Sequence, residues 1–402
     1  MIRFWYLPED RNYILLNDTF KNKITEILKN KNYPYKLRNK FMSSKISLKI
    51  IKKISNDLEI PLETFEKNIT WIGGSNSRGL SKPKLPFNLE SREGSRFIAG
   101  IINDGCLTKD GEESYGRLMY DNFDKTLRDS MINNYLSIFG GNPNEISFRN
   151  YEKKKYLEFS SVIRDIIHLI IKEKGPKSES NLSIPSFILN DKEAILGWIE
   201  QAIADEGNVN YNLNKYRREI VWRRSLDVTP LFNSPINKEI PFKKLPLNIQ
   251  KLLYKQKCKL IEEEKKILDL LGISYNEYNI GVYPTNKGKI RTRWQISITK
   301  RENLIKLRKL IKIPSKEKDK KFSLMCNEFQ RYKEPLKIKN AIIRLGKNKK
   351  IFTSIDLKLS MKYKNISATH KWLRIFGKQG IIEKVKESTH RKPAEYKLTP
   401  NK

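Results

Sequence analysis

Two stretches of the chain share one hydrophobic pattern, in which a run of apolar and small residues stops at an acid and a glycine. The first stretch is FIAGIINDG, residues 97–105, and the second is WIEQAIADEG, residues 198–207. Runs of this length and composition are typical of buried helices. The pattern therefore predicts two buried helices, each with a carboxylate at its C-terminal end.

Regular alternation follows the second stretch. Val209, Tyr211 and Leu213 alternate with asparagines, which is the period-two pattern of a half-buried strand. Further periodic segments come next: a strand at 218–226, a long helix at 248–272, a hairpin at 277–300 and a helix at 301–311. The predicted order is helix, two strands, helix, two strands, helix.

A weaker copy of the same order follows the first stretch. It predicts a strand at 116–122, a helix at 123–141, paired strands at 144–150 and 155–161, and a helix at 162–175. Two copies of one structural unit imply a molecule with pseudo-twofold symmetry.

This duplicated arrangement resembles the LAGLIDADG homing endonucleases in their single-chain, two-motif form, over about residues 93–312. The resemblance implies an α+β fold with a duplicated αββαββα core, divided into a first repeat at 93–180 and a second at 181–312. It also implies that the two motif helices pack against each other. Their interface would be formed by small and apolar residues, which are Ile98, Ala99, Gly100, Ala202 and Ala204.

The resemblance assigns catalysis and metal binding to Asp104 and Glu206, which it places side by side at the ends of the two motif helices. Two carboxylates at helix C-termini face each other's charge and the negative ends of two helix dipoles, so they need a cation. Mg²⁺, or Mn²⁺ in its place, suits ligation by oxygen atoms shared with a phosphate. Gly105, Asp205 and Gly207 are further candidates for metal contact.

The second motif departs from the family pattern at two positions. Gln201 stands where a small residue is usual, so its amide must find a partner in the helix interface. Asp205 precedes Glu206, which leaves the register of the catalytic acid open by one residue. Alignment on Gly207 favours Glu206.

One face of the last predicted strands is suited to DNA recognition. In KIRTRWQISIT, residues 289–299, apolar Ile290, Trp294, Ile296 and Ile298 alternate with polar side chains. The polar face fits base edges and phosphates of a major groove, which admits a β-ribbon. An ordinary solvated face is the alternative. The candidate DNA contacts are Lys289, Arg291, Arg293 and Gln295, with Asn208, Asn210 and Asn212 on the same surface, and Arg223 and Arg224 as basic residues near the metals.

The chain before this core has its own pattern. Residues 1–72 contain short basic helical segments, and the phrase ISLKIIKKISNDLEIPLETF resembles a repressor-type helix-turn-helix DNA-binding domain. A basic helical cap without a role in DNA binding is the alternative. Residues 73–92 are rich in Gly, Ser and Pro and predict a linker, and residues 313–334 predict a second linker after the core.

Residues 335–402 resemble a winged-helix domain, because three short helical patterns precede a pair of alternating strands around a basic turn. The helix that begins near Ser367 would enter the major groove, and the wing would contribute His390 and Arg391. A role in protein–protein contacts is the alternative. The candidate groove-facing residues of that helix are Thr369, His370, Lys371 and Arg374.

Charge supports a nucleic-acid partner. Lys and Arg number 80 against 45 Asp and Glu, and the net charge of +35 is spread along the chain, so a polyanion is the expected partner. No stretch has the length and apolar character of a membrane span, and no signal peptide opens the chain. We therefore expect a soluble, cytoplasmic and nucleoid-associated protein. The cysteines and histidines are scattered, which excludes zinc-ligand spacing and a disulfide framework.

Together these features predict a monomeric, site-specific endonuclease of mobile-intron type that cuts both strands of a long asymmetric or pseudo-palindromic DNA target. A scaffold that has lost catalysis and regulates transcription by binding DNA is a second hypothesis, and the two flanking modules suit it as well. A third hypothesis is an RNA maturase that assists the splicing of an intron. Retention of both acids favours the enzyme over the regulator, but it leaves a role on intron RNA open.

Overall fold

The computed structural model describes residues 1–75, 77–107, 117–151, 154–171, 182–212, 217–331, 335–363, 366–389 and 393–400. The chain forms two compact units, Met1–Ser323 and Leu324–Lys402. Each unit combines helices with antiparallel sheet, which confirms the predicted α+β fold class. No helix in the described ranges is long and apolar enough to cross a membrane.

The first repeat of unit 1 follows the predicted order of elements. Its strands form an antiparallel sheet in the order β5-β6-β8-β7. Helices pack on the face of this sheet that carries its buried side chains, such as Tyr120 and Leu157. The elements are α5 (Arg92–Asn103), β5 (Gly105–Leu107), β6 (Leu118–Asp121), α6 (Lys125–Phe139), β7 (Ser147–Tyr151), β8 (Lys154–Phe159) and α7 (Ser161–Ile171).

The second repeat has the same order and a larger sheet, β11-β12-β13-β10-β9. A short helix, α8 (Ser186–Leu189), precedes it. The elements are α9 (Lys192–Glu206), β9 (Gly207–Asn212), β10 (Arg217–Asp227), β11 (Ile240–Pro241), α10 (Leu247–Lys255), α11 (Lys259–Leu270), β12 (Asn276–Pro284), β13 (Ile290–Ile298) and α12 (Arg301–Leu310).

The long helix predicted at 248–272 is wrong in one respect, because the chain breaks it into α10 and α11. Leu253 of α10 packs into a small outer cluster with Val228 and Val282. Ile261 and Ile267 of α11 are fully buried in the main core instead. The two segments pack into different apolar clusters. The spacing of apolar residues along the sequence is the same for one continuous helix as for two consecutive helices, so periodicity does not distinguish them.

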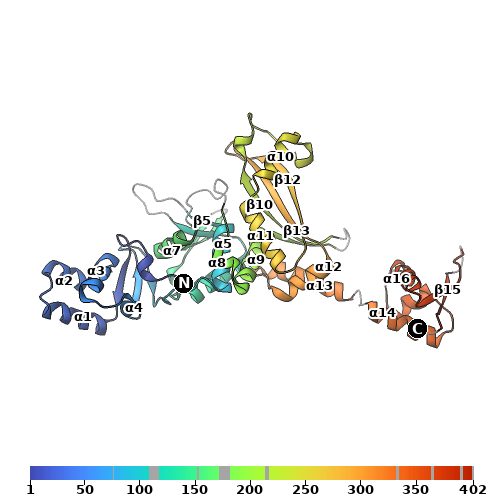
Figure 1. The fold of residues 1–402 in the computed structure, drawn as a ribbon, viewed down its shortest axis with the longest axis horizontal. Helices are drawn as coiled ribbons and strands as arrows, with labels where there is room; N and C mark the ends of the chain where they lie inside the picture. The colour runs from blue at the N-terminus through green and yellow to red at the C-terminus, as the bar shows by residue number, and fades with distance from the viewer. Residues whose placement is uncertain are drawn as a thin grey trace. The chain divides into compact units, whose positions relative to one another are not determined.

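Helices α5 and α9 lie side by side in the middle of unit 1 (Figure 1). Their close approach depends on small residues, since a Cβ at Gly197 of α9 would lie 2.2 Å from the backbone oxygen of Arg92. The residues predicted for this interface are all buried, namely Ile98, Ala99, Gly100, Ala202 and Ala204. Packing of the two motif helices thus brings the C-terminal end of one repeat's helix to that of the other.

The N-terminal part of unit 1 contains the predicted basic helices together with a sheet that the periodicity did not predict. Its strands pair in the order β2-β1-β3-β4 and are two to five residues long, too short for alternation to be recognised. The elements are β1 (Tyr13–Leu16), α1 (Asp18–Asn30), α2 (Tyr35–Met42), β2 (Ile46–Ser47), α3 (Leu48–Leu58), α4 (Leu62–Glu66), β3 (Ile69–Gly73) and β4 (Leu80–Ser81).

The described parts of both predicted linkers are packed structure. In the segment 73–92, Leu80, Phe87 and Leu89 are buried, and Phe87 forms a β-bridge with Ile2, which joins the N-terminal part to the core. The segment 313–334 contains helix α13 (Lys316–Arg331), whose Phe322 is fully buried. The polar composition that suggested linkers belongs to the solvated side of these segments, while a few spaced apolar residues hold the other side to the core.

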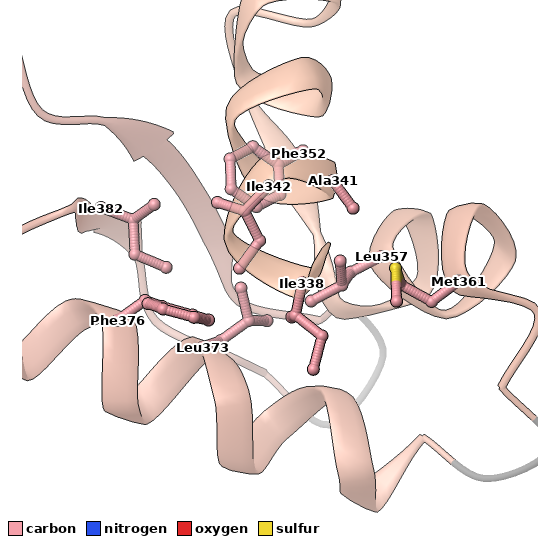
Figure 2. Packing of buried hydrophobic residues seen from close by; sticks show 9 residues of the cluster. All are labelled: Ile338, Ala341, Ile342, Phe352, Leu357, Met361, Leu373, Phe376 and Ile382. Carbon is pink, nitrogen blue, oxygen red and sulfur yellow. The ribbon is translucent and has the colours of Figure 1, made fainter. Parts of the chain in front are cut away.

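Unit 2 has three helices followed by two strands, in the order that the sequence predicted. A short strand, β14, also pairs in its sheet, whose order is β14-β16-β15. Figure 2 shows that apolar residues of all three helices, among them Ile342, Leu357 and Phe376, meet in one core with Phe352 and Ile382. The elements are α14 (Pro335–Asn348), β14 (Phe352–Thr353), α15 (Ser354–Met361), α16 (Ser367–Lys378), β15 (Ile382–Lys386) and β16 (Glu395–Leu398).

Candidate active site and nucleic-acid interface

Asp104 and Glu206 occupy equivalent turns at the ends of α5 and α9. A Cβ added to Gly105 would meet the backbone of Ile101, and one added to Gly207 would meet the backbone of Ile203. Each glycine therefore packs against the residue four positions before it. Asp104 directly precedes Gly105, and Glu206 directly precedes Gly207. This equivalence favours Glu206, rather than Asp205, as the counterpart of Asp104.

Asp205 points into the helix interface, where three side chains bind it. The Tyr120 hydroxyl donates to Asp205 Oδ1 at 2.8 Å, and Asn103 Nδ2 donates to Oδ2 at 3.2 Å. Gln201 Nε2 lies 2.9 and 3.0 Å from the two oxygens. The amide nitrogen of the fully buried Gln201 thus has a partner, whereas its Oε1 is buried without a hydrogen bond among the described residues. Asp205 takes the place that Asn103 holds on the other helix.

Burial and then the negative charge of Asp104 raise the pKa of Asp205 from 3.8 to about 8. Between those values the folded protein binds more protons at Asp205 than the unfolded chain does, so folding stability should fall as the pH rises. We expect Asp205→Asn to remove a slope of up to about 1.4 kcal/mol per pH unit over this window. Denaturant unfolding of both proteins in EDTA, from about pH 4 to pH 8, measures it; parallel curves would contradict the assignment.

Asp104 is half-buried and faces β6. Asn122 Nδ2 donates to Asp104 Oδ2 at 2.7 Å, and the Asp121 amide donates to the Asp104 carbonyl at 3.0 Å. These contacts fix the orientation of the carboxylate relative to the sheet. Asp104 nevertheless remains partly exposed to solvent.

Glu206 is exposed, and a buried arginine lies behind it. Arg224 Nη1 is 3.8 Å from Glu206 Oε1 and donates to Asn103 Oδ1 at 2.7 Å. The same guanidinium donates through Nε and Nη2 to Glu264, which also accepts from the indoles of Trp198 and Trp222 at 3.2 and 2.9 Å. Arg224 is thus near the predicted metal position, but only 5% of it is exposed. The prediction that Arg224 contacts DNA is wrong, because its buried guanidinium donates to Glu264 and Asn103.

The candidate recognition face lies where the alternation placed it. Ile290, Trp294, Ile296 and Ile298 are buried, while Arg291 and Arg293 are half-exposed on the opposite side. The Arg293 guanidinium sits 4.3 Å over the Tyr283 ring, and Lys289 Nζ is 3.4 Å from Asp227. The apolar side chains of the strand therefore lie on the face that was predicted to be buried, with Arg291, Arg293 and Lys289 on the opposite, polar side.

Gln295 lines a shallow pocket on that face together with residues that include Arg223 and Tyr278, and it is hydrogen-bonded to both. Gln295 Nε2 donates to the Tyr278 hydroxyl and Gln295 Oε1 accepts from Arg223 Nε at 2.8 Å, so Gln295 is only 5% exposed. Direct base reading by Gln295 does not fit this burial. Arg223 and Asn208 are exposed. Asn210 donates to Glu219 at 3.0 Å. The Asn212 side chain lies outside the described part of the structure.

Lys318 is a site residue that the sequence interpretation missed. It comes from α13, in the stretch predicted to be a linker, and its Nζ donates to the carbonyls of Ala204 and Ile203 at the C-terminal end of α9. Burial lowers the pKa of its ammonium group, while the nearby carboxylates of Asp205 and Asp104 act in the opposite direction. A cation at a helix C-terminus offsets the helix dipole. No sequence signal separates Lys318 from the other lysines of a chain this basic.

The carboxylates at the ends of α5 and α9 meet only part of what a hard cation such as Mg²⁺ requires. The acids at the two helix ends present oxygen ligands, yet within the described residues no three carboxylate, histidine or cysteine groups are gathered for metal binding. Mg²⁺ is commonly held by one or two carboxylates, with waters and substrate phosphates completing its coordination. Asp104 and Glu206 offer carboxylate oxygens of the kind that such a metal takes.

Helix α16 of unit 2 presents Lys371 and Arg374 to solvent. Thr369, predicted to face DNA, is fully buried and donates its hydroxyl to the Ile366 carbonyl, so that prediction is wrong. His390 and Arg391 lie outside the described residues. The exposed face of α16 thus presents His370, Lys371 and Arg374, three of the four residues that were predicted to face the groove.

Comparison with known proteins yields a remote likeness. No family model matches the chain. No curated protein matches it either. Among solved structures, it is similar to "The homing endonuclease I-WcaI bound to its DNA recognition sequence", at 12% identity and a TM-score of 0.30, over 57% of this chain and 85% of that chain. At this identity and TM-score, neither the activity nor the site residues of that enzyme carry over to this chain.

Proposed function

We propose that this protein is a metal-dependent endonuclease that cuts both strands of duplex DNA at a specific site. The arrangement of α5 and α9 carries the proposal, because two packed helices from two repeats end in Asp104 and Glu206 at equivalent turns. A duplex has two strands related by a near-twofold axis, so paired acids about such an axis suit one cut in each strand. Exposed basic side chains on the sheet of the second repeat support a nucleic-acid substrate.

The residues around the two acids have distinct tasks in this mechanism. Asp104 and Glu206 would hold Mg²⁺ or Mn²⁺, which supplies Lewis-acid activation of water and stabilises the charge of the leaving oxygen. Asn122 orients the Asp104 carboxylate through its 2.7 Å hydrogen bond. Arg224 limits the movement of Glu206 from below, and Lys318 offsets part of the negative charge at the end of α9. Asp205 and Tyr120 keep the two helix ends together.

Selection of cleaved molecules from a random duplex library in Mg²⁺ tests the function. We expect one enriched target longer than a single major-groove site, cut on both strands, and no cleavage in EDTA. Enrichment of a bound sequence without cleavage in either Mg²⁺ or Mn²⁺ would contradict the enzyme and favour a DNA-binding regulator. Binding of intron RNA in preference to every duplex would favour the maturase.

Arg293 provides a test of the recognition face. We expect Arg293→Ala to weaken binding by about 1 to 3 kcal/mol if the side chain reads a base, with preference relaxed at one target position, or to weaken all targets alike if it binds a phosphate. Binding to a panel of single-base variants of the selected target distinguishes the two. Lys266→Ala, at an exposed position on α11, serves as the control. Equal affinities for the wild type and Arg293→Ala would remove this face from the interface.

A further inference from the structure

An arginine-lined pocket lies at the junction between the N-terminal part of unit 1 and the sheet of the first repeat. The pocket has a volume of about 310 Å³, and its polar lining includes Ser77, Arg78, Arg117, Ser147, Arg149 and Arg164. None of these residues belongs to the carboxylate site or to the recognition face of the second repeat. We propose that this arginine pocket binds a backbone phosphate of duplex DNA.

Charge in the pocket is unevenly compensated. Glu158 lies 2.8 Å from Arg149 and 3.6 Å from Arg117, so two guanidinium groups share its carboxylate. Glu145 also lines the pocket, but its carboxylate accepts from Ser81 and from the Asn142 amide, and among the described residues no arginine forms an ion pair with it. Arg78 donates to the neutral Ser147 hydroxyl, and among the described residues no carboxylate forms an ion pair with it. The pocket therefore carries a net positive charge centred on Arg78.

Arg78 is exposed, but the loop that carries it is constrained and its guanidinium already donates to the Ser147 hydroxyl. A Cβ at the next residue, Gly79, would lie 2.1 Å from the Trp71 indole, so the chain can take this course only with a glycine there. Ser77 Oγ lies 2.8 Å from Ser161 Oγ, which ties the same loop to the start of α7. Positioned donors lose little conformational entropy on binding an anion, which favours a built phosphate site over a mobile surface arginine.

The N-terminal part is itself fastened to the first repeat next to the pocket. Arg11 Nη2 lies 2.8 Å from Asp165 Oδ1, and Asn12 Nδ2 donates to Oδ2 at 2.9 Å. Arg164, which lines the pocket, donates to the same buried carboxylate at 2.7 Å. The pocket walls therefore come from two parts of the chain that a buried ion cluster keeps in register.

Arg149 places the pocket on the face of the first repeat's sheet that corresponds to the recognition face of the second repeat. In β8, Leu157 and Phe159 are buried towards the helices, whereas Glu158 lies on the other face, and Arg149 of β7 pairs with it there. The equivalent hairpin of the second repeat is β12–β13, which carries Arg291 and Arg293 on its polar face. One duplex lying along both sheets would extend past β7 and meet the pocket.

This proposal rests on the proposed binding of duplex DNA, but not on cleavage. The test uses the full chain and a fluorescent duplex of about 40 base pairs, with the association constant measured across a salt series. Each lost phosphate contact lowers the slope of log affinity against log salt by about 0.9. We expect that loss for Arg78→Ala, a preserved slope for Arg78→Lys, and a preserved slope for Arg301→Ala, an exposed control on α12.

The outcomes separate this site from the catalytic one. Thermal melting should show that the Arg78→Ala variant is folded. An unchanged salt slope in folded Arg78→Ala would overturn the phosphate site. An unchanged slope together with lost binding of inorganic phosphate would show that the pocket takes a small anion instead. A wild type that binds DNA with the expected slopes but never cleaves would overturn the proposed enzyme and leave the phosphate site standing.

Discussion

Replacing Asp104 by Asn or Glu206 by Gln is expected to lower DNA cleavage by more than about a hundredfold while binding is kept or improves. In the proposed mechanism each change removes a metal ligand and with it several kcal/mol of transition-state charge stabilisation. Each also removes a negative charge that repels the phosphates of the duplex. Cleavage under single-turnover conditions and binding in Ca²⁺, measured separately on the selected target, report the two effects.

Asp129→Asn is the matched control, because Asp129 is an exposed acid of α6 that pairs only with Lys125 among the described residues. This control should leave the cleavage rate and the affinity for DNA unchanged. Full cleavage by either acid variant would remove that residue from the catalytic centre. Full cleavage by Glu206→Gln together with loss of cleavage in Asp205→Asn would move the second catalytic acid back by one residue.

Replacing Arg224 by Ala should destabilise unit 1 by about 3 to 5 kcal/mol, since it strands a buried carboxylate. Glu264 is fully buried and would keep only the two indole donors of Trp198 and Trp222. Desolvation of an unpaired charge is costly in such surroundings, so the loss should exceed the value of the ion pair itself. Equilibrium unfolding in urea, followed by tryptophan fluorescence, measures the change directly.

Arg223→Ala supplies a control from the neighbouring position on the same strand. Arg223 is exposed and donates to Gln295, so its loss should cost less than about 1 kcal/mol. Similar destabilisation by both variants would mean that Arg224 is not the group that compensates Glu264. Cleavage by Arg224→Ala at a temperature where it is still folded would further show how far Glu206 depends on the arginine behind it.

Prediction from sequence worked best where the signal was local and repeated. Apolar periodicity identified α5, α9 and the strands that follow them, because a helix or strand with one buried face must show that face at fixed intervals. It also placed Trp294 inside and Arg293 outside. It missed the sheet of the N-terminal part, since strands of a few residues show too little alternation to be recognised.

By itself, therefore, the sequence determined the duplicated αββαββα order, the α+β class and the acids at the ends of the two motif helices. Only the tertiary structure decided which charged groups are available. Arg224 is buried because Glu264, 40 positions further along the chain, folds beneath it. Lys318 reaches the backbone carbonyls at the end of α9 because α13 packs where composition suggested a linker. The sequence shows that a side chain is polar; whether it meets solvent, a partner or a phosphate depends on distant residues that only folding brings together.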